Sequence, residues 1–217
     1  MSTASNHKKI LFMTQFSILL AIEALFCFTP LGSLPALGPI VATVAIVPVV
    51  ITAILLGPGA GTAMGAFAGL FSFIVWSFMP PPQSAFMAFV FTPFYSVGEY
   101  SGNFWSLVIC FVPRILSGTV AAYVFKGMRR MRAQRENLAF LLAGALGSLV
   151  NTFGVTLGIF FFFGRSYAAA IGIGYDLLLG IIVTTIVTSG IPEAVINALA
   201  ALFVCRPIHR YLLKHAE

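Results

Sequence analysis

The chain has 217 residues, of which 59% are hydrophobic and only 8% are charged. A soluble domain carries about 25% charged residues, so this composition excludes a soluble globular protein and indicates an integral membrane protein. The formal net charge of +6 is compatible with nucleic-acid binding. No stretch interleaves basic and aromatic residues on a polar face, however, so we expect no nucleic-acid partner. The length suits a single membrane domain, residues 1–217.

The positions of the basic residues predict which parts of the chain face the cytoplasm. Ten of the twelve Lys and Arg residues lie in three clusters at the edges of apolar blocks. The clusters are Lys8 and Lys9; Lys126, Arg129, Arg130, Arg132 and Arg135; and Arg206, Arg210 and Lys214. Basic residues that flank membrane spans stay on the cytoplasmic side. We therefore expect both termini and the central cluster in the cytoplasm, which requires an even number of spans.

Six segments are apolar and long enough to cross a bilayer, because a membrane-spanning helix needs ~20 apolar residues. They lie near residues 10–29, 38–56, 59–78, 105–125, 138–163 and 174–204. We expect the last of them to be broken or tilted, because it is longer than one span needs. The sequence thus predicts an all-α integral membrane protein with six transmembrane helices and both termini inside.

Glycine and proline mark the connection between the second and third predicted spans. The sequence Gly57–Gly61 (GPGAG) predicts a tight turn, since these residues supply the backbone angles that a turn needs. Glycines recur at spacing four in this region, at Gly57, Gly61, Gly65 and Gly69. Small residues at that spacing let another helix approach closely, which predicts packing within the bundle.

The longest connection on the predicted outer side, residues 79–104, is rich in proline and aromatic residues. Its aromatic residues include Phe86, Phe89, Phe91, Phe94, Tyr95, Tyr100 and Phe104. A long aromatic loop is typical of a lid or a binding loop. A partial helix on the membrane surface that carries an interfacial aromatic belt is an alternative, and the two interpretations are compatible.

Polar residues within predicted spans are candidates for a site, because each is costly in a bilayer unless it is paired. Arg114 follows Pro113 in the fourth span, and its guanidinium offers a planar fork for a carboxylate or a phosphate. The alternatives are a structural ion pair with Glu23 or Asp176, or a side chain that extends to the outer interface.

Amide and hydroxyl side chains form a second set of candidates. Asn151 and Thr152 lie near the middle of the fifth span, where they bind a ligand or join helices through hydrogen bonds. Glu193 and Asn197 lie one helical turn apart in the last span. Their depth toward the cytoplasm favours structural or partner-facing roles over ligand contact. The threonines and serines before them are more typical of helix packing.

Several catalytic patterns are missing from the chain. Its histidines are His7, His209 and His215, all near the ends, so we expect no metal site within the membrane. The three cysteines are isolated and are expected to pack as small apolar residues. No phosphate-binding loop, HExxH or GxSxG sequence occurs, so an enzymatic activity is poorly supported.

Three segments and their order along the chain resemble a known family of transport proteins. Residues 44–61 (VAIVPVVITAILLGPGAG) are similar to that family's second-to-third span segment. Residues 112–118 (VPRILSG) with 121–126 (AAYVFK) resemble its fourth span, and residues 149–153 (LVNTF) resemble its fifth. The family is the substrate-binding S components of energy-coupling-factor (ECF) vitamin transporters. The resemblance extends from residue 10 to about residue 204.

The resemblance implies a subunit of a bacterial cell-membrane importer, with no ATPase activity and no cofactor of its own. Its implied partners are a membrane-embedded T component, two ATPases and a vitamin. The family's first span carries an Ala-xxx-Ala pair that contacts the T component, and here Ser17 and Ala21 occupy that position, with Ser in place of the first Ala. The family's outward pocket implies five substrate-binding residues: Arg114, Asn151, Thr152, Phe94 and Tyr95.

The fourth-span and fifth-span segments look most like the pantothenate-type branch of the family. An arginine for the carboxylate and an asparagine for the amide or hydroxyl groups suit pantothenate chemically. A pyridoxine-like compound, folate and riboflavin are alternative vitamins. Two other functions stay open as alternatives. A stand-alone secondary transporter typically shows internal repeats, and a membrane enzyme acting on lipids needs clustered acids or a nucleophile–base pair. We find neither pattern in the sequence.

Overall fold

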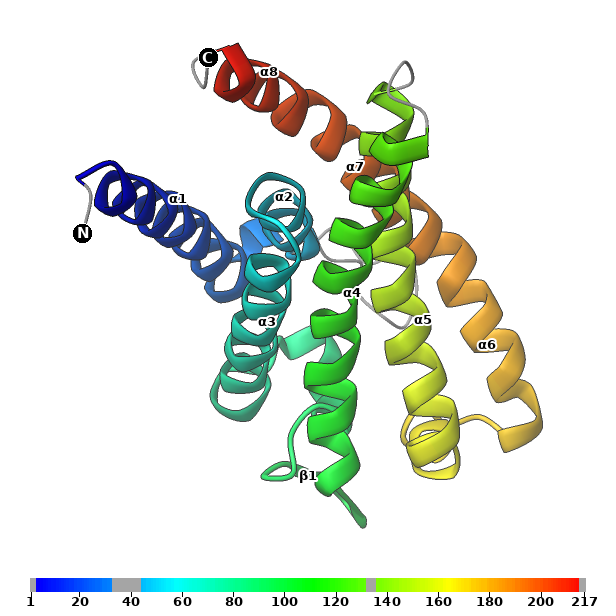
Figure 1. Cartoon of the computed structure of the whole chain (residues 1–217). Helices are drawn as coiled ribbons and strands as arrows, with labels where there is room; N and C mark the ends of the chain where they lie inside the picture. The colour runs from blue at the N-terminus through cyan, green and yellow to red at the C-terminus, as the bar shows by residue number, and fades with distance from the viewer. Residues whose placement is uncertain (1–2, 33–43, 132–135, 215–217) are drawn as a thin grey trace.

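The computed structural model describes residues 3–32, 44–131 and 136–214, which form a helical bundle with one small hairpin (Figure 1). The α-helices are α1 (Thr3–Phe28), α2 (Ile46–Leu56), α3 (Pro58–Phe78), α4 (Phe104–Met131), α5 (Glu136–Ala170), α6 (Leu178–Thr185), α7 (Ile191–Ala200) and α8 (Arg206–Lys214). The 3-10 segments are η1 (Pro30–Gly32), η2 (Pro82–Val90) and η4 (Tyr175–Leu177), and the π-helical segments are η5 (Ile186–Gly190) and η6 (Ala201–Cys205). Strands β1 (Ser96–Val97) and β2 (Tyr100–Ser101) pair antiparallel.

Within the described residues, five helical segments are long and apolar enough to cross a membrane. They comprise residues 6–28 of α1, then α3, α4, α5 and the path Tyr175–Tyr211. Helix α2 is also apolar but has only 11 residues. Residues 38–43 of the predicted second span lie outside the described part. An all-α membrane protein is therefore confirmed. Helix α4 continues past its predicted end through the basic segment 126–131, and α5 continues through residues 164–170, of which Tyr167 and Ala168 are buried in the core.

The glycine-rich turn and the glycine repeat have the predicted structural roles. Gly57 has φ of 91°, a left-handed conformation that favours glycine, and it separates α2 from α3. A Cβ at Gly61 would lie 2.9 Å from the carbonyl oxygen of Gly118, and a Cβ at Gly65 would overlap the carbonyl of Arg114. The repeat therefore brings the backbone of α3 against that of α4, within the bundle.

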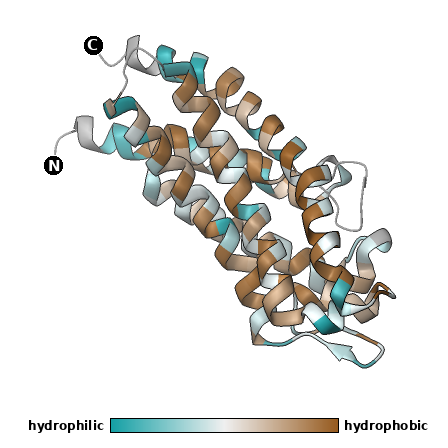
Figure 2. Ribbon diagram, turned by 90° about the vertical axis from the view of Figure 1, so that its right-hand side faces the viewer, coloured by the Kyte–Doolittle hydropathy of each residue, from teal (hydrophilic) through white to brown (hydrophobic). Residues whose placement is uncertain are grey.

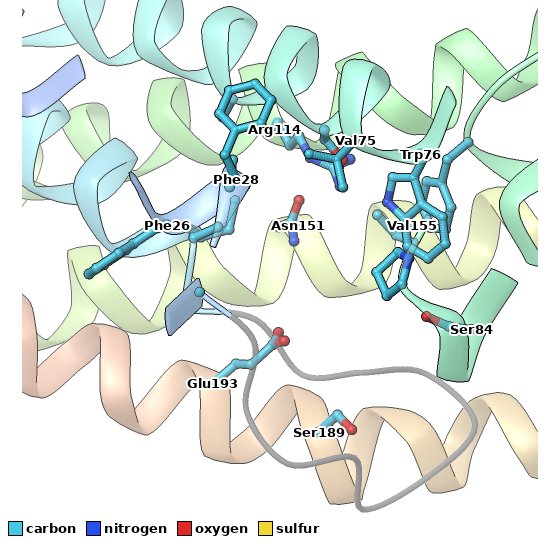
Figure 3. Close-up of a pocket in the computed structure, with 18 of the residues that line it drawn as sticks. Phe26, Phe28, Val75, Trp76, Ser84, Arg114, Asn151, Val155, Ser189 and Glu193 are labelled. Atoms are coloured by element: carbon cyan, nitrogen blue, oxygen red, sulfur yellow. The ribbon is translucent and has the colours of Figure 1, made fainter. Parts of the chain in front are cut away.

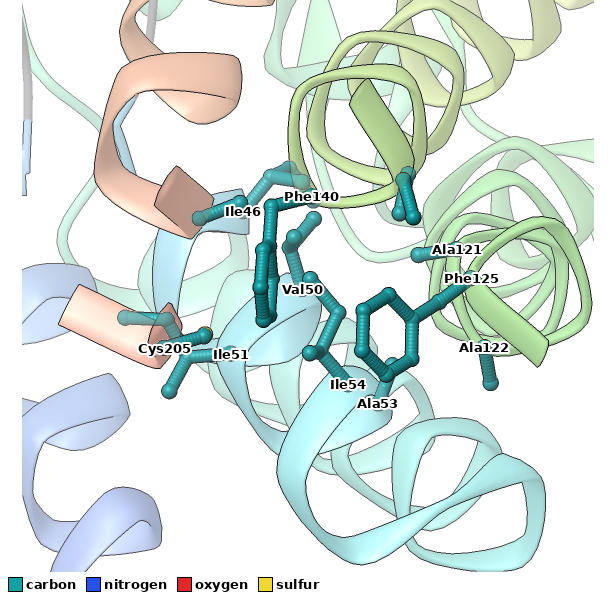
Figure 4. Close-up of a cluster of buried hydrophobic side chains, with 13 residues drawn as sticks. Ile46, Val50, Ile51, Ala53, Ile54, Ala121, Ala122, Phe125, Phe140 and Cys205 are labelled. Atoms are coloured by element: carbon teal, nitrogen blue, oxygen red, sulfur yellow. The ribbon is translucent and has the colours of Figure 1, made fainter. Parts of the chain in front are cut away.

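Three apolar clusters of buried side chains hold the described helices together, and the smallest joins α2 to α3 through Val49, Met64 and Ala68. The cluster in Figure 4 joins α2, α4, α5 and the last helical path through Ile46, Val50, Ile51, Ala53, Ile54, Ala121, Ala122, Phe125, Phe140 and Cys205, among others. The second cluster joins η2, α5 and α6 through residues that include Phe89, Ile159, Tyr167 and Leu178. Segment η2 is therefore a packed element of the fold, not an open loop.

The last helical path, residues 178–214, stays helical throughout instead of breaking. It widens into π-helical turns at η5 and η6, and at η5 the amide of Ile191 donates to the carbonyl of Ile186, five residues back. Every fourth residue along one line is exposed, namely Leu179, Val183, Val187, Ile191, Val195, Leu199 and Phe203. Every fourth residue along another line is buried, namely Thr185, Ser189, Glu193, Asn197, Ala201 and Cys205. We call the second set the buried line.

The polar residues of the bundle gather at its ends. The start of α1 and the end of α8 lie at the same end of the molecule, and the β1–β2 hairpin lies at the other (Figures 1 and 2). Hydrophilic residues concentrate at the end with the termini, while the middle of the bundle is hydrophobic (Figure 2). At that polar end, Glu136 forms an ion pair with Arg210 at 3.5 Å and lies 3.4 Å from His209 Nδ1, and these contacts tie α5 to α8.

Candidate ligand-binding site

A cavity of about 460 Å³ lies among the helices, and every described helix from α1 to α7 contributes to its wall. This volume falls within the range of roughly 300–1,000 Å³ that is usual for small-molecule sites. The wall is apolar over most of its area and carries a few polar side chains, among them Glu23 and Thr152. Arg114, Asn151 and Glu193 also belong to the wall, and Figure 3 shows them around the cavity. An apolar cavity with a few fixed polar groups is the usual form of a binding site for a vitamin-sized molecule.

Arg114 is the basic residue of the cavity wall, and its guanidinium is held in place by neighbours on α4 and α3. Nη1 donates to the carbonyl oxygen of Cys110 at 2.7 Å and to that of Ile109 at 3.4 Å. The Ile109 carbonyl lacks its usual helical donor because residue 113 is a proline. Nη2 donates to Ser72 Oγ at 3.0 Å. These bonds orient the charge before any ligand arrives.

The counter-charge of Arg114 is not supplied by a carboxylate of the described chain. Among the described residues, Glu136 is the carboxylate that lies within 4.0 Å of a basic side chain, with His209 and Arg210 as its neighbours, so no carboxylate oxygen in this part lies within 4.0 Å of Arg114. The expected alternatives, an ion pair with Glu23 or with Asp176, are absent. The nearest cation–π partner is the ring of Phe91, whose centroid lies 5.9 Å from the guanidinium carbon.

Helix α5 faces the same cavity with two polar residues. Asn151 is buried, and its Oδ1 has no hydrogen-bond partner within the described part of the chain. Thr152 Oγ1 donates to Glu193 Oε2 at 3.0 Å, which links α5 to α7. In Figure 3, Asn151 lies between Arg114 on one side and Glu193 on the other. The structure therefore places Arg114, Asn151 and Thr152 on the wall of one cavity, and their role in substrate binding stays a prediction.

Several polar residues of the wall were not predicted as site residues, among them Ser189, Glu193 and Glu23. Ser189 and Glu193 belong to the buried line, and they face the cavity although their position in the chain favoured structural roles. Glu23 on α1 is fully buried and accepts a hydrogen bond from the Cys27 thiol at 3.2 Å. Cys27 is thus not merely a small apolar residue. A lone carboxylate in an apolar span is itself a signal of function, and this signal marks Glu23.

The aromatic segment contributes to the cavity through residues other than the predicted ones. Trp76 stacks on Phe91 with ring centroids 4.7 Å apart, and both line the cavity together with Met87. Phe94 is 76% exposed and contacts Phe73 outside the cavity wall, and Tyr95 is also outside it. The segment therefore reaches the site through its packed part, η2 and Phe91.

The predicted docking pair lies on a different surface. Ser17 and Ala21 are exposed and one helical turn apart on α1, so they share a face of that helix. Glu23 of the same helix is buried against the cavity, so α1 presents one face to the site and another to its surroundings.

Comparisons with known proteins identify the kind of molecule that carries this cavity. A family model described as "ECF transporter, substrate-specific component" matches residues 11–205. The chain belongs to this family. One relative of this ECF substrate-specific component is the pantothenic acid transporter PanT of Lactococcus lactis subsp. cremoris (strain MG1363). The two are 33% identical over 167 residues, which cover 74% of this chain and 80% of the relative. The matched region of the family model includes the lining helices of the cavity from α1 to α7.

Proposed function

We propose that this ECF substrate-specific component binds pantothenate in the cavity around Arg114 and supplies it to an ATP-driven importer. The observation that carries the proposal is a guanidinium held toward a small-molecule cavity with no carboxylate partner within 4.0 Å in the described chain. A ligand that brings its own carboxylate compensates this charge. The relative named as a pantothenic acid transporter supports pantothenate as that ligand.

The remaining groups of the wall suit the rest of the pantothenate molecule, which carries a carboxylate, an amide, two hydroxyl groups and two methyl groups. Asn151 Oδ1 offers a free acceptor for an amide or hydroxyl donor of the ligand. Trp76, Phe91 and Val155 offer an apolar surface for the methyl groups. Thr152 takes part by holding Glu193 in place. Phe94 and Tyr95 lie outside the cavity wall, so a contact between them and the ligand requires the hairpin region to rearrange.

The proposed topology is a single membrane domain with six spans, in which α2 and the residues before it form the second span. Both termini are proposed to be cytoplasmic. The supporting observations are that hydrophilic residues concentrate at the end where α1 begins and α8 ends (Figure 2), and that Lys8 and Lys9 lie near the start of α1 and Arg210 and Lys214 in α8. Segment η2 and the part of the cavity that it lines then lie in the outer half of the membrane.

The proposed partners follow from the family. The T component docks on the exposed face of α1 through Ser17 and Ala21, whose small side chains allow close helix approach. Two ATPases supply the energy, and this chain acts as a binding subunit without catalytic activity. Membership of the family of ECF substrate-specific components supports an ATP-driven complex, in which this subunit selects the substrate.

Calorimetry on the purified protein tests the proposal. Pantothenate is titrated first, followed by a pyridoxine-like compound, riboflavin and folate. We expect saturable binding of pantothenate and none of the others at comparable concentrations. Tight binding of another vitamin would assign that vitamin instead, and no binding across the panel would refute the proposed function. Uptake by the lone protein in liposomes, without a T component and ATPases, would show a secondary transporter.

A further inference from the structure

Glu23 is a buried carboxyl group with an unused acceptor. Its side chain is fully shielded from solvent, yet it lines the cavity. Among the described residues, Oε1 receives only the weak Cys27 thiol donor, at 3.2 Å, and Oε2 has no hydrogen-bond partner. Native proteins pair almost all of their buried polar atoms, so an unpaired carboxyl oxygen on a cavity wall requires an explanation.

The other acidic residue of the wall provides a contrast. Glu193 Oε2 already receives the hydroxyl of Thr152 at 3.0 Å, and Glu193 also supports Asn197, whose Nδ2 donates to the Glu193 carbonyl at 2.8 Å. Glu193 therefore belongs to a hydrogen-bonded link between α5 and α7. Among the described residues, Glu23 has no comparable hydrogen bond to another helix, since its bonded partner Cys27 lies on the same helix α1.

The guanidinium of Arg114, in the same cavity, does not donate a hydrogen bond to Glu23 either. Arg114 donates to Ser72 and to backbone carbonyls of α4, and it makes no ion pair with Glu23. The cavity therefore has two separate polar poles, a donor pole on α4 and an acceptor pole on α1. A ligand that fits both has a carboxylate at one position and a hydrogen-bond donor at another.

We infer that Glu23 is a ligand-binding residue that accepts a hydrogen bond from a hydroxyl group of the substrate and thereby selects hydroxylated acids. The inference rests on the proposed function, because it assumes that a carboxylate ligand occupies the Arg114 pole. Pantothenate carries hydroxyl groups at the end of the molecule opposite to its carboxylate. A site built around a buried acceptor rejects analogues that lack the matching donor, because the acceptor then stays unpaired.

The experiment compares two ligands on two proteins. The ligands are pantothenate and its dideoxy analogue, in which hydrogen replaces both hydroxyl groups. The proteins are the wild type and Glu23→Gln, which keeps the size of the side chain but replaces one carboxyl oxygen with an amide nitrogen that only donates. We expect the affinity of Glu23→Gln for pantothenate to fall about tenfold or more, since a buried polar group that loses its partner carries the full cost of its desolvation. Its affinity for the dideoxy analogue should stay within about threefold of the wild type.

Two controls keep the result interpretable. Glu99→Gln makes the same chemical change at an exposed glutamate of the hairpin, and it should bind both ligands like the wild type. Glu23→Leu removes both acceptor oxygens, so it should lower pantothenate affinity at least as much as Glu23→Gln does. Equal losses for both ligands, or no loss for either, would overturn the role of Glu23 while the proposed function stands. If the wild type binds no pantothenate, the proposed function fails first and this inference fails with it.

Discussion

Replacing Arg114 with alanine removes the donor pole of the cavity. In the structure the guanidinium is already fixed by Cys110 at 2.7 Å and Ser72 at 3.0 Å, so it loses little conformational freedom when a ligand binds. The Arg114→Ala variant therefore loses a preorganised partner for the carboxylate, and we expect it to bind pantothenate much more weakly. The helix itself should persist, because alanine is the best helix former.

The size of the effect follows from the kind of bond that is lost. Hydrogen bonds to charged groups contribute about 1.5–3 kcal/mol each. One such bond corresponds to a loss of affinity of about 10-fold to 150-fold, since each 1.4 kcal/mol is a factor of ten. Arg114→Lys keeps the positive charge but loses the planar fork and the bond to Ser72. We therefore expect Arg114→Lys to lie between alanine and the wild type.

Calorimetric titration with pantothenate measures these affinities, and Arg165→Ala is the matched control. Arg165 is exposed and contacts the ring of Tyr175 at 6.0 Å, outside the cavity wall. Its removal should leave the affinity unchanged. If Arg114→Ala and Arg165→Ala bound pantothenate as tightly as the wild type, the guanidinium would have no part in ligand recognition and the reasoning from the unpaired charge would be wrong.

Three further predictions follow from the packing. The chain has two tryptophans, and Trp76 lines the cavity while Trp105 stacks on a ring elsewhere, so ligand binding should change tryptophan fluorescence in Trp105→Phe but not in Trp76→Phe. Gly118→Ala should lower the free energy of unfolding by about 1–3 kcal/mol, because its Cβ would overlap a carbonyl oxygen of α3. The same change at Gly127, where a Cβ meets nothing within 4 Å, should leave thermal unfolding unchanged or raise Tm slightly. Ala21→Trp should prevent co-purification with a T component and two ATPases while the lone subunit keeps its vitamin affinity.

Each of these predictions has an outcome that contradicts it. A fluorescence change that survives Trp76→Phe would place the ligand away from the Trp76 side of the cavity. Equal Tm values for the alanine variants at Gly118 and Gly127 would mean that α3 and α4 are not in close contact at this point. A complex that assembles normally with Ala21→Trp would move the docking surface away from this face of α1.

The sequence predicted the bundle well because span formation depends on local composition. Long apolar segments and the basic residues between them are visible in any window of the chain, and five of the predicted spans are long helices in the structure. Arg114 and Asn151 were found for a similar reason, since a polar residue within an apolar span is rare enough to stand out. Glu23 stood out equally, but it was considered only as a partner for Arg114.

The parts that the sequence did not predict depend on how the helices face one another. Phe94 and Tyr95 belong to an aromatic-rich segment, but composition does not tell which aromatic residues pack inward, and the cavity receives Phe91 and Trp76 instead. Glu193 was assigned a structural role from its depth along the helix. Depth alone does not give the direction of a side chain, which here depends on the π-helical turn just before it.

Because of that π-helical turn, the number of residues in the last helix decides which side chains face the cavity as much as their composition does. A regular α-helix turns ~100° per residue, so residues four apart shift by about 40° at each step and leave a common face within a few turns. The wider π-helical turns reduce this shift, which keeps the buried line facing the bundle. Deleting one residue between Ile186 and Gly190 would rotate Glu193 by about 100° relative to α6. Substitutions along the exposed side of this helix are therefore easily tolerated, whereas an insertion or deletion there changes which side chains the ligand meets.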